Sequence, residues 1–281
     1  MAVIIVSAGY YISLSVNRAS EKTLLVLRID DVQDFAFRDA QLHLFRSSLA
    51  NKISVSLSVI AKLFGSDKEL VDTVRSMINL GCEVTVHGWE HENLTKLTSS
   101  EQGQGLRRAK ERLKAVLSVD ATVLVPPLFS YNNDTLQAMR MSRYGVVSGL
   151  AELHQAGQVS EGILSIPATI ELSNFSNGTW RMKSVETVID ELSMSTRIYG
   201  YGVIVTHPQE FFKGGTVDQD SIKTYEQLIQ SLQANYFFTT FEKLRNNIIY
   251  SESRVSDMQN ISLLNCKLAV FAVRFLGRIQ T

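Results

Sequence analysis

Short apolar runs alternate with amphipathic stretches along most of this 281-residue chain, and this alternation constrains its fold more than any other feature. Apolar runs of about four to eight residues are typical of buried strands, whereas longer amphipathic stretches are typical of helices. Strands that alternate with helices of this length form parallel sheets joined by crossover helices. The number of repeats favours a closed barrel over an open sheet, so the sequence predicts an α/β barrel.

The predicted elements follow one another regularly from residue 24 onwards. The predicted strands are Leu24–Ile29, Ile53–Leu57, Cys82–Val86, Thr122–Val125, Gly145–Val147, Ile163–Ile166, Val203–Thr206 and Tyr236–Thr239. The predicted helices are Phe37–Asn51, Asp67–Leu80, Ser99–Leu117, Asp134–Arg140, Val185–Ile198 and Ser221–Ala234. Two segments, Ala151–Gly162 and Asn174–Gly178, are predicted to be loops over the barrel mouth.

The two ends of the chain differ from this alternating region. Residues 2–16 are apolar and almost uncharged, but about fifteen residues are short for a spanning helix, which needs ~20. We interpret residues 1–20 as a clipped signal anchor or signal peptide, which would associate the protein with a membrane or place it outside the cytoplasm. The alternative is a first strand or helix of the soluble domain, which would allow a cytoplasmic protein.

Residues 251–281 form a C-terminal extension with apolar side chains at three- to four-residue spacing, the pattern of an amphipathic helix. Such a helix packs on its own domain or, alternatively, lies on a membrane or contacts a partner. A catalytic domain is therefore expected over residues 21–250. Cys82, in a predicted strand, and Cys266, in this helix, are expected to be buried thiols and not a disulfide.

The composition excludes some classes of function. The 28 Lys and Arg residues balance the 28 Asp and Glu residues, so nothing indicates nucleic acid or another polyanionic partner. Apolar residues make up 45% of the chain and charged residues 20%, which provides for a sizeable core and argues against disorder. The sequence is that of a globular protein.

Groups that bind metals and transfer protons stand at the ends of two predicted strands. Asp30 and Asp31 end the first apolar run, and His87 and His91 follow the run that ends at Val86. In parallel α/β proteins, the carboxyl ends of strands form the active site. Carboxylates and imidazoles are ligands for a divalent metal such as Zn²⁺. Of two adjacent carboxylates, one can bind the metal and the other can transfer a proton.

Two further strand ends carry candidate functional residues. His207 follows Val203–Thr206, and an imidazole that titrates near neutral pH can act as a general acid. Pro126 and Pro127 end another strand, and Tyr131 follows them; paired prolines stiffen a rim loop and place aromatic faces toward a cleft, where they can stack on sugar rings. Taken alone, the histidine would be a hydrogen-bonded core residue and the prolines a simple turn.

These motifs, in this order, resemble those of the NodB-type polysaccharide deacetylases, carbohydrate esterase family four. The resemblance runs from about residue 23 to about residue 245 and rests on four segments. They are Leu27–Asp31, His87–His91, the strand ending at Pro126–Pro127, and Val205–His207. It implies a distorted (β/α)₇ barrel with a divalent metal, usually zinc.

The resemblance also implies roles for individual residues. Asp31, His87 and His91 would be the metal ligands, Asp30 the general base and His207 the general acid. The implied reaction is the removal of N-acetyl groups from a polysaccharide or glycan by a metal-activated water. Pro126, Pro127 and Tyr131 are expected to bind the substrate, and Trp89 is expected to line the sugar site or, alternatively, to pack under the metal.

The sequence departs from the family's pattern at the position before the proline pair. The family has an arginine there that orients the catalytic aspartate, and this chain has Val125. Without a nearby cation, Asp30 should have a raised pKa and a less fixed position. Arg28 lies two residues earlier and, on a regular strand, faces the same side as Asp30, so we expect it to orient Asp30 instead.

Two other functions remain open at this point. One is a metal-dependent amidase that acts on carbon–nitrogen bonds outside sugars. The other is a catalytically inactive barrel that binds carbohydrate, which the altered proline motif favours. The joint presence of Asp30, Asp31, His87, His91 and His207 argues for the enzyme.

Overall fold

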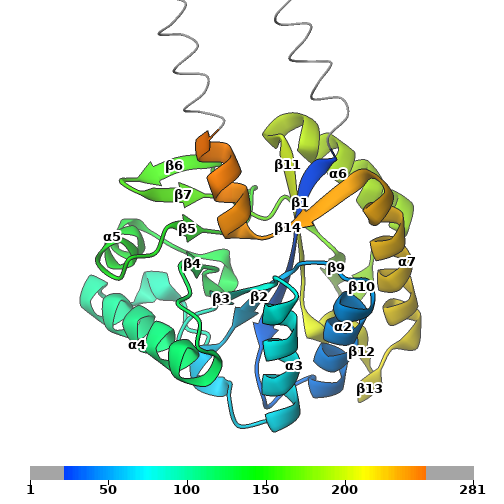
Figure 1. Cartoon of the computed structure of the whole chain (residues 1–281), viewed down its shortest axis with the longest axis horizontal. Coiled ribbons are helices and arrows are strands. Elements are labelled where there is room, and N and C mark those ends of the chain that lie inside the picture. The colour runs from blue at the N-terminus through cyan, green and yellow to red at the C-terminus, as the bar shows by residue number, and fades with distance from the viewer. Residues whose placement is uncertain (1–21, 251–281) are drawn as a thin grey trace, which may run out of the picture. The chain divides into compact units, whose positions relative to one another are not determined.

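The computed structural model describes residues 22–250, and the predicted alternation of strands and helices is present within them (Figure 1). The chain divides into two units, Met1–Phe241 and Glu242–Thr281, and residues 242–250 of the second are helical. The terminal segments 1–20 and 251–281, with Cys266, lie outside the described residues, so their interpretations stay predictions. No helix within residues 22–250 is long and apolar enough to cross a membrane.

The secondary structure of the first unit has the following bounds. The strands are β1 (Thr23–Val32), β2 (Ser56–Val59), β3 (Glu83–Val86), β4 (Val123–Leu124), β5 (Val146–Val147), β6 (Gly157–Ser160), β7 (Ile163–Ser165), β8 (Ile170–Glu171), β9 (Ser173–Ser176), β10 (Thr179–Met182), β11 (Tyr201–Thr206), β12 (Phe212–Lys213), β13 (Thr216–Val217) and β14 (Tyr236–Thr239). The α-helices are α2 (Arg38–Ala50), α3 (Lys68–Asn79), α4 (Ser99–Leu117), α5 (Asn133–Met141), α6 (Val185–Tyr199) and α7 (Gln219–Asn235). Short 3₁₀ turns are η1 (Ala61–Leu63), η2 (Leu94–Lys96), η3 (Pro127–Phe129) and η4 (Pro208–Phe211).

A curled, mostly parallel sheet organises this unit. Its strands follow the order β6-β7-β5-β4-β3-β2-β1-β11-β8, and β14 pairs with the N-terminal part of β1. The pairing of β6 with β7 is antiparallel, whereas the pairings from β5 through β1 to β8 are parallel. A backbone bridge between Leu150 and Ala168 links the end beyond β5 to the segment before β8. The predicted distorted (β/α)₇ barrel is confirmed.

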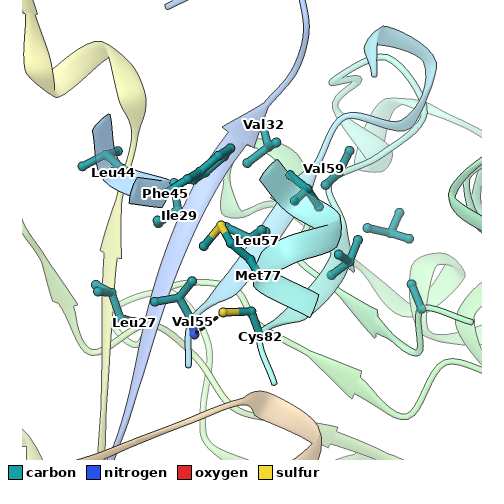
Figure 2. Packing of buried hydrophobic residues seen from close by; sticks show 14 of the residues in the cluster. Leu27, Ile29, Val32, Leu44, Phe45, Val55, Leu57, Val59, Met77 and Cys82 are labelled. Atoms are coloured by element: carbon teal, nitrogen blue, oxygen red, sulfur yellow. Dashed lines mark hydrogen bonds between the residues drawn. The ribbon is translucent and has the colours of Figure 1, made fainter. Parts of the chain in front are cut away.

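The two faces of β1 have different surroundings. Leu27 and Ile29 belong to a buried cluster that includes Phe45 of α2 and Met77 of α3 (Figure 2). Each such side chain stabilises the fold by roughly 1.5–3 kcal/mol when fully buried. Successive strand residues point to opposite faces, so the intervening Arg28 faces the barrel interior. The core of the sheet therefore fixes the position of the polar residues on the other face of β1.

The thiol of Cys82 is buried within the same cluster, as predicted. Its sulfur accepts a hydrogen bond from the Val55 backbone N–H at 3.4 Å (Figure 2).

Three predicted segments differ from the structure. The strand predicted at Ile53–Leu57 is β2, displaced toward the C-terminus, because the small buried Ser56 and Ser58 interrupt the apolar pattern that the prediction relied on. The two predicted loops are wrong in part: Ala151–Gly162 contains β6, and Asn174–Gly178 belongs to the antiparallel hairpin β9–β10.

Candidate active site

The C-terminal ends of β1, β3, β4 and β11 lie at the same edge of the sheet, because these strands belong to one set of parallel pairings. Asp30 and Asp31 lie near the end of β1, His87 follows β3, and His207 follows β11. The predicted metal ligands, base and acid are therefore brought to one place by the topology.

An irregularity in β1 brings two consecutive carboxylates into this site. The register between β1 and β2 shifts between Ile29 and Val32, and Asp31 has a φ of 58°. Adjacent residues of a regular strand point to opposite faces, whereas a bulge redirects a side chain. Aspartate tolerates the left-handed region better than most residues do. Asp30 and Asp31 consequently both reach the imidazoles of the site.

Asp31, His87 and His91 form a cluster with the composition of a metal site. Oδ1 of Asp31 lies 3.1 Å from Nε2 of His87 and 3.1 Å from Nε2 of His91. Although these atoms are close, this buried oxygen has no hydrogen-bond partner among the described residues. Ligand atoms that share one ion at about 2.0–2.2 Å lie at such separations. The residues present therefore fit a divalent metal.

The outer contacts of these ligands also suit metal binding. Nδ1 of His87 donates a hydrogen bond to the Val125 carbonyl oxygen at 2.8 Å, so Nε2 is the ring nitrogen that faces Asp31 and would bind a metal. Oδ2 of Asp31 accepts a hydrogen bond from Nε2 of Gln209 at 2.8 Å. In each residue, the atom that does not face the cluster makes a hydrogen bond, and this bond orients the atom that would bind the metal. The cluster has one carboxylate and two imidazoles, which leaves positions for water or substrate.

The charges of the cluster depend on one another. Burial alone would raise the pKa of the Asp31 carboxyl, but the adjacent His87 and His91 hold that pKa well below its usual range. The contact with Asp31 in turn raises the pKa of His91. Asp31 is therefore an ionised carboxylate, the form that binds metal.

Asp30 is held by Arg28, as the sequence predicted from the strand geometry. Both side chains are fully buried, and Nη2 of Arg28 donates to Oδ2 of Asp30 at 2.8 Å. Nη1 of Arg28 donates to the carbonyl oxygen and to Oγ of Ser148, both at 2.8 Å, which fixes the guanidinium across the barrel. Burial would raise the pKa of Asp30, but Arg28, His87 and His207 together lower it. The raised pKa expected in the absence of a cation therefore does not occur.

We expect Arg28→Met to destabilise the protein by about 3–5 kcal/mol, because the substitution leaves the Asp30 carboxylate buried without its partner. Chemical denaturation monitored by circular dichroism measures this loss. The double variant Arg28→Met/Asp30→Asn should recover most of the stability, because it removes both charges. Arg46→Met is the matched control: its salt bridge to Glu69 is exposed and should contribute less than about 1 kcal/mol. Equal effects at the two arginines would contradict the prediction.

His207 is held by a carboxylate that the sequence analysis did not identify. Nδ1 of His207 donates to Oε1 of the buried Glu210 at 2.8 Å, and Nε2 lies 3.9 Å from Oδ2 of Asp30. Burial would lower the pKa of His207, but Glu210 and the aspartates raise it to about 9. The imidazole is therefore protonated near neutral pH, as a general acid must be.

The predicted substrate-binding residues have different surroundings. Trp89 is partly buried, and the Arg108 guanidinium of α4 lies 4.2 Å from its ring centroid, which favours the packing alternative for this residue. Pro126 and Pro127 are buried below the rim. Tyr131 stacks on His154 with ring centroids 4.0 Å apart, and its hydroxyl lies 3.5 Å from Oγ of Ser165. Binding of substrate by these residues stays a prediction.

Two aromatic residues outside the predicted set contact His207. The Trp180 ring, on β10, stacks on the imidazole of His207 with centroids 5.9 Å apart. The Phe129 ring meets the same imidazole edge-on at 6.3 Å. Both Leu128 and Phe129 have positive φ angles, 56° and 54°, which is strained for bulky residues and is typical of functional loops.

Residues 19–147 match the family model of the polysaccharide deacetylases. This match covers a little under half of the chain, and over these residues the chain is similar to that family. The match agrees with the predicted enzyme class, a polysaccharide deacetylase-like hydrolase of carbon–nitrogen bonds. No protein with a curated description matches the sequence.

Solved structures with the same fold accompany the polysaccharide deacetylase match. A putative polysaccharide deacetylase from Mycobacterium smegmatis aligns with a TM-score of 0.62 and 17% identity, covering 82% of this chain and 92% of that one. A family 4 acetyl xylan esterase from Clostridium thermocellum in complex with cobalt aligns at 0.53 and 13%, covering 79% and 89%. A family pseudoenzyme from Bacillus anthracis aligns at 0.53 and 12%, covering 80% and 66%. At these identities the alignments show the fold.

Proposed function

We propose that this protein is a polysaccharide deacetylase, a metal-dependent enzyme that removes N-acetyl groups from a polysaccharide or glycan. The observation that carries the proposal is the cluster in which Asp31 Oδ1 lies 3.1 Å from Nε2 of both His87 and His91. A base, Asp30, and a protonated acid, His207, stand beside this cluster. The family match supports the choice of a polymeric substrate.

Asp31, His87 and His91 would hold the metal, for which we propose zinc. A bound divalent ion supplies Lewis-acid polarisation of a carbonyl and lowers the pKa of water from about 16 toward about 7. The cobalt in the acetyl xylan esterase structure supports a divalent ion on this fold, and an Asp-His-His set also accepts iron(II) or nickel.

The chain's own residues account for the movement of protons. Oδ1 of Asp30 is buried and has no hydrogen-bond partner among the described residues, so it is available to take a proton from the attacking water. The water oxygen adds to the acetyl carbon, and the carbon–nitrogen bond then breaks. Nε2 of His207 donates its proton to the leaving amine, while Glu210 keeps the ring oriented through Nδ1. The products are acetate and a free amino sugar.

Metal removal tests the proposal. The purified protein is expected to contain about one equivalent of zinc and to release acetate from N-acetylglucosamine oligomers. A chelator should abolish acetate release, and added zinc should restore it. The same protein treated with the metal-saturated chelator is the control. Acetate release that is unaffected by metal removal would exclude the mechanism.

The inactive carbohydrate-binding barrel is the second candidate function. Two observations favour it: Val125 replaces the family's arginine, and a pseudoenzyme is among the proteins with this fold. It predicts glycan binding without acetate release from the zinc-loaded protein.

The amidase alternative predicts acetate release from small acetamides that have no sugar ring, at a rate comparable with that from the oligomers.

We also propose that residues 1–20 direct the protein to a membrane or out of the cytoplasm, where a polymeric glycan would be accessible. The support is the apolar, uncharged sequence of residues 2–16.

A further inference from the structure

The β9–β10 hairpin carries an aromatic ring that is exposed although it is held in place. Phe175 on β9 is 62% exposed, and its ring contacts that of Trp180 on β10 with centroids 4.8 Å apart. Trp180 in turn stacks on His207 at 5.9 Å. The contacts form a row of rings that runs from the general acid to the protein surface.

The hairpin is fixed to the active site at a second point. Oγ of Ser173, at the start of β9, donates a hydrogen bond to Oε2 of Glu210 at 2.9 Å. The other oxygen of the same carboxylate accepts from Nδ1 of His207. The hairpin and the general acid therefore share one buried carboxylate, which restrains the position of Phe175 relative to the reacting groups.

The local sequence also shapes this hairpin. Asn177 and Gly178 have φ angles of 52° and 75° and form the two-residue turn, since Ser176 pairs with Thr179. Phe175 pairs with Trp180 across the hairpin, and Ser173 pairs with Met182, so these four uncharged residues share one face. Arg181 pairs with Asn174 and belongs to the opposite face. An uncharged face with rigid aromatic anchors suits a neutral ligand that presents an apolar ring face, such as a sugar.

We infer that the hairpin Ser173–Met182 is a binding subsite for a neutral sugar unit next to the one that is deacetylated, with Phe175 as the stacking surface and Trp180 as its support. This inference rests on the proposed function, because it takes the reacting glycan to be at His207. It deepens that function by selecting oligomeric over monomeric substrates. A rigid exposed ring binds the apolar face of a sugar with little loss of side-chain entropy.

Fluorescence gives a binding test that does not depend on catalysis. The chain has two tryptophans, so Trp89→Phe leaves Trp180 as the single indole. Titration of this variant with N-acetylglucosamine tetramer should change its emission in a saturable way, and the monosaccharide should have no effect at equal concentration. Adding Phe175→Ala to this variant should weaken tetramer binding about tenfold, as is typical for truncation of a central anchor. No change in emission with the tetramer would overturn the inference.

Acetate release gives the second test. Phe175→Ala should lower kcat/KM for the tetramer about tenfold, mainly through KM, and leave the value for the monosaccharide unchanged. Phe175→Tyr should retain most of the wild-type value. Phe237→Ala is the matched control, because this phenylalanine is 58% exposed but pairs with Leu24 at the other end of β1. An equal loss for tetramer and monosaccharide, or no loss for either, would overturn the inference.

These experiments distinguish failure of the proposed function from failure of the subsite. If the zinc-loaded protein releases no acetate from any oligomer but the tetramer still titrates Trp180 and needs Phe175, the proposed function fails and the subsite stands. If acetate is released and Phe175→Ala behaves like Phe237→Ala in both assays, the subsite fails and the proposed function stands.

Discussion

Asp31→Asn is expected to remove both the bound metal and acetate release. Asparagine keeps the shape of the side chain and tolerates the left-handed φ of 58°, so the bulge in β1 should survive. It lacks the negative charge and the strong ligand oxygen that the cluster with His87 and His91 needs. Loss of an outer-shell partner already weakens metal binding roughly 10–100-fold, and loss of a direct ligand should exceed this. Metal content by elemental analysis and acetate release measure the two effects.

The control for this experiment is Asp39→Asn, which changes an exposed aspartate in the first turn of α2. It should bind metal and release acetate like the wild type. Full metal occupancy and turnover in Asp31→Asn would show that the cluster is not the metal site, whatever its geometry suggests.

Asp30→Asn is expected to retain metal and to lose activity by about 10²–10⁴-fold, the usual contribution of a general base. Asparagine has nearly the same shape as aspartate and can still accept a hydrogen bond from Arg28, but its amide cannot take a proton from water. The decrease should appear in kcat and in kcat/KM alike, because the interaction is made in the transition state. Steady-state acetate release from N-acetylglucosamine tetramer gives both constants.

The expected result separates the two neighbouring carboxylates, since one variant loses metal and the other keeps it. Denaturation curves should accompany the kinetics, because Asp30→Asn also leaves the Arg28 charge buried without its partner. Near-wild-type turnover in metal-loaded Asp30→Asn would reject Asp30 as the base.

Much of the fold could be predicted because local signals and burial agree. The predicted helix Ser99–Leu117 matches α4, whose start is set by a capping box in which Thr98 and Glu101 satisfy each other's backbone N–H groups. The predicted strand Leu24–Ile29 lies within β1. It could be recognised because a strand that is buried on both faces has a continuous apolar run. The β9–β10 hairpin was missed, although Asn177–Gly178 is a strong turn signal, because its strands are mostly exposed and carry little hydrophobic pattern.

The site residues that stand at strand ends could be predicted from the sequence. The contacts that these residues make across the barrel could not. Asp31, His87 and His91 are brought together by strand topology, and the topology follows from the alternation of elements. Ser148 beside Arg28 and Trp180 beside His207 depend on how the sheet curls, which no local pattern encodes. Glu210 had a weak signal, since Pro208 and Glu210 after His207 resemble the start of a helical turn.

The hydrogen bond from His87 to the carbonyl oxygen of Val125 uses the polypeptide backbone, so replacement of the side chain at position 125 leaves this contact available. Arg28 and Asp30 already form a fully buried ion pair, and Val125 is also fully buried. An arginine at position 125 would place a second guanidinium at a buried position, at the cost of its desolvation. We therefore expect Val125→Arg to destabilise this chain, because Arg28 already forms the buried ion pair with Asp30.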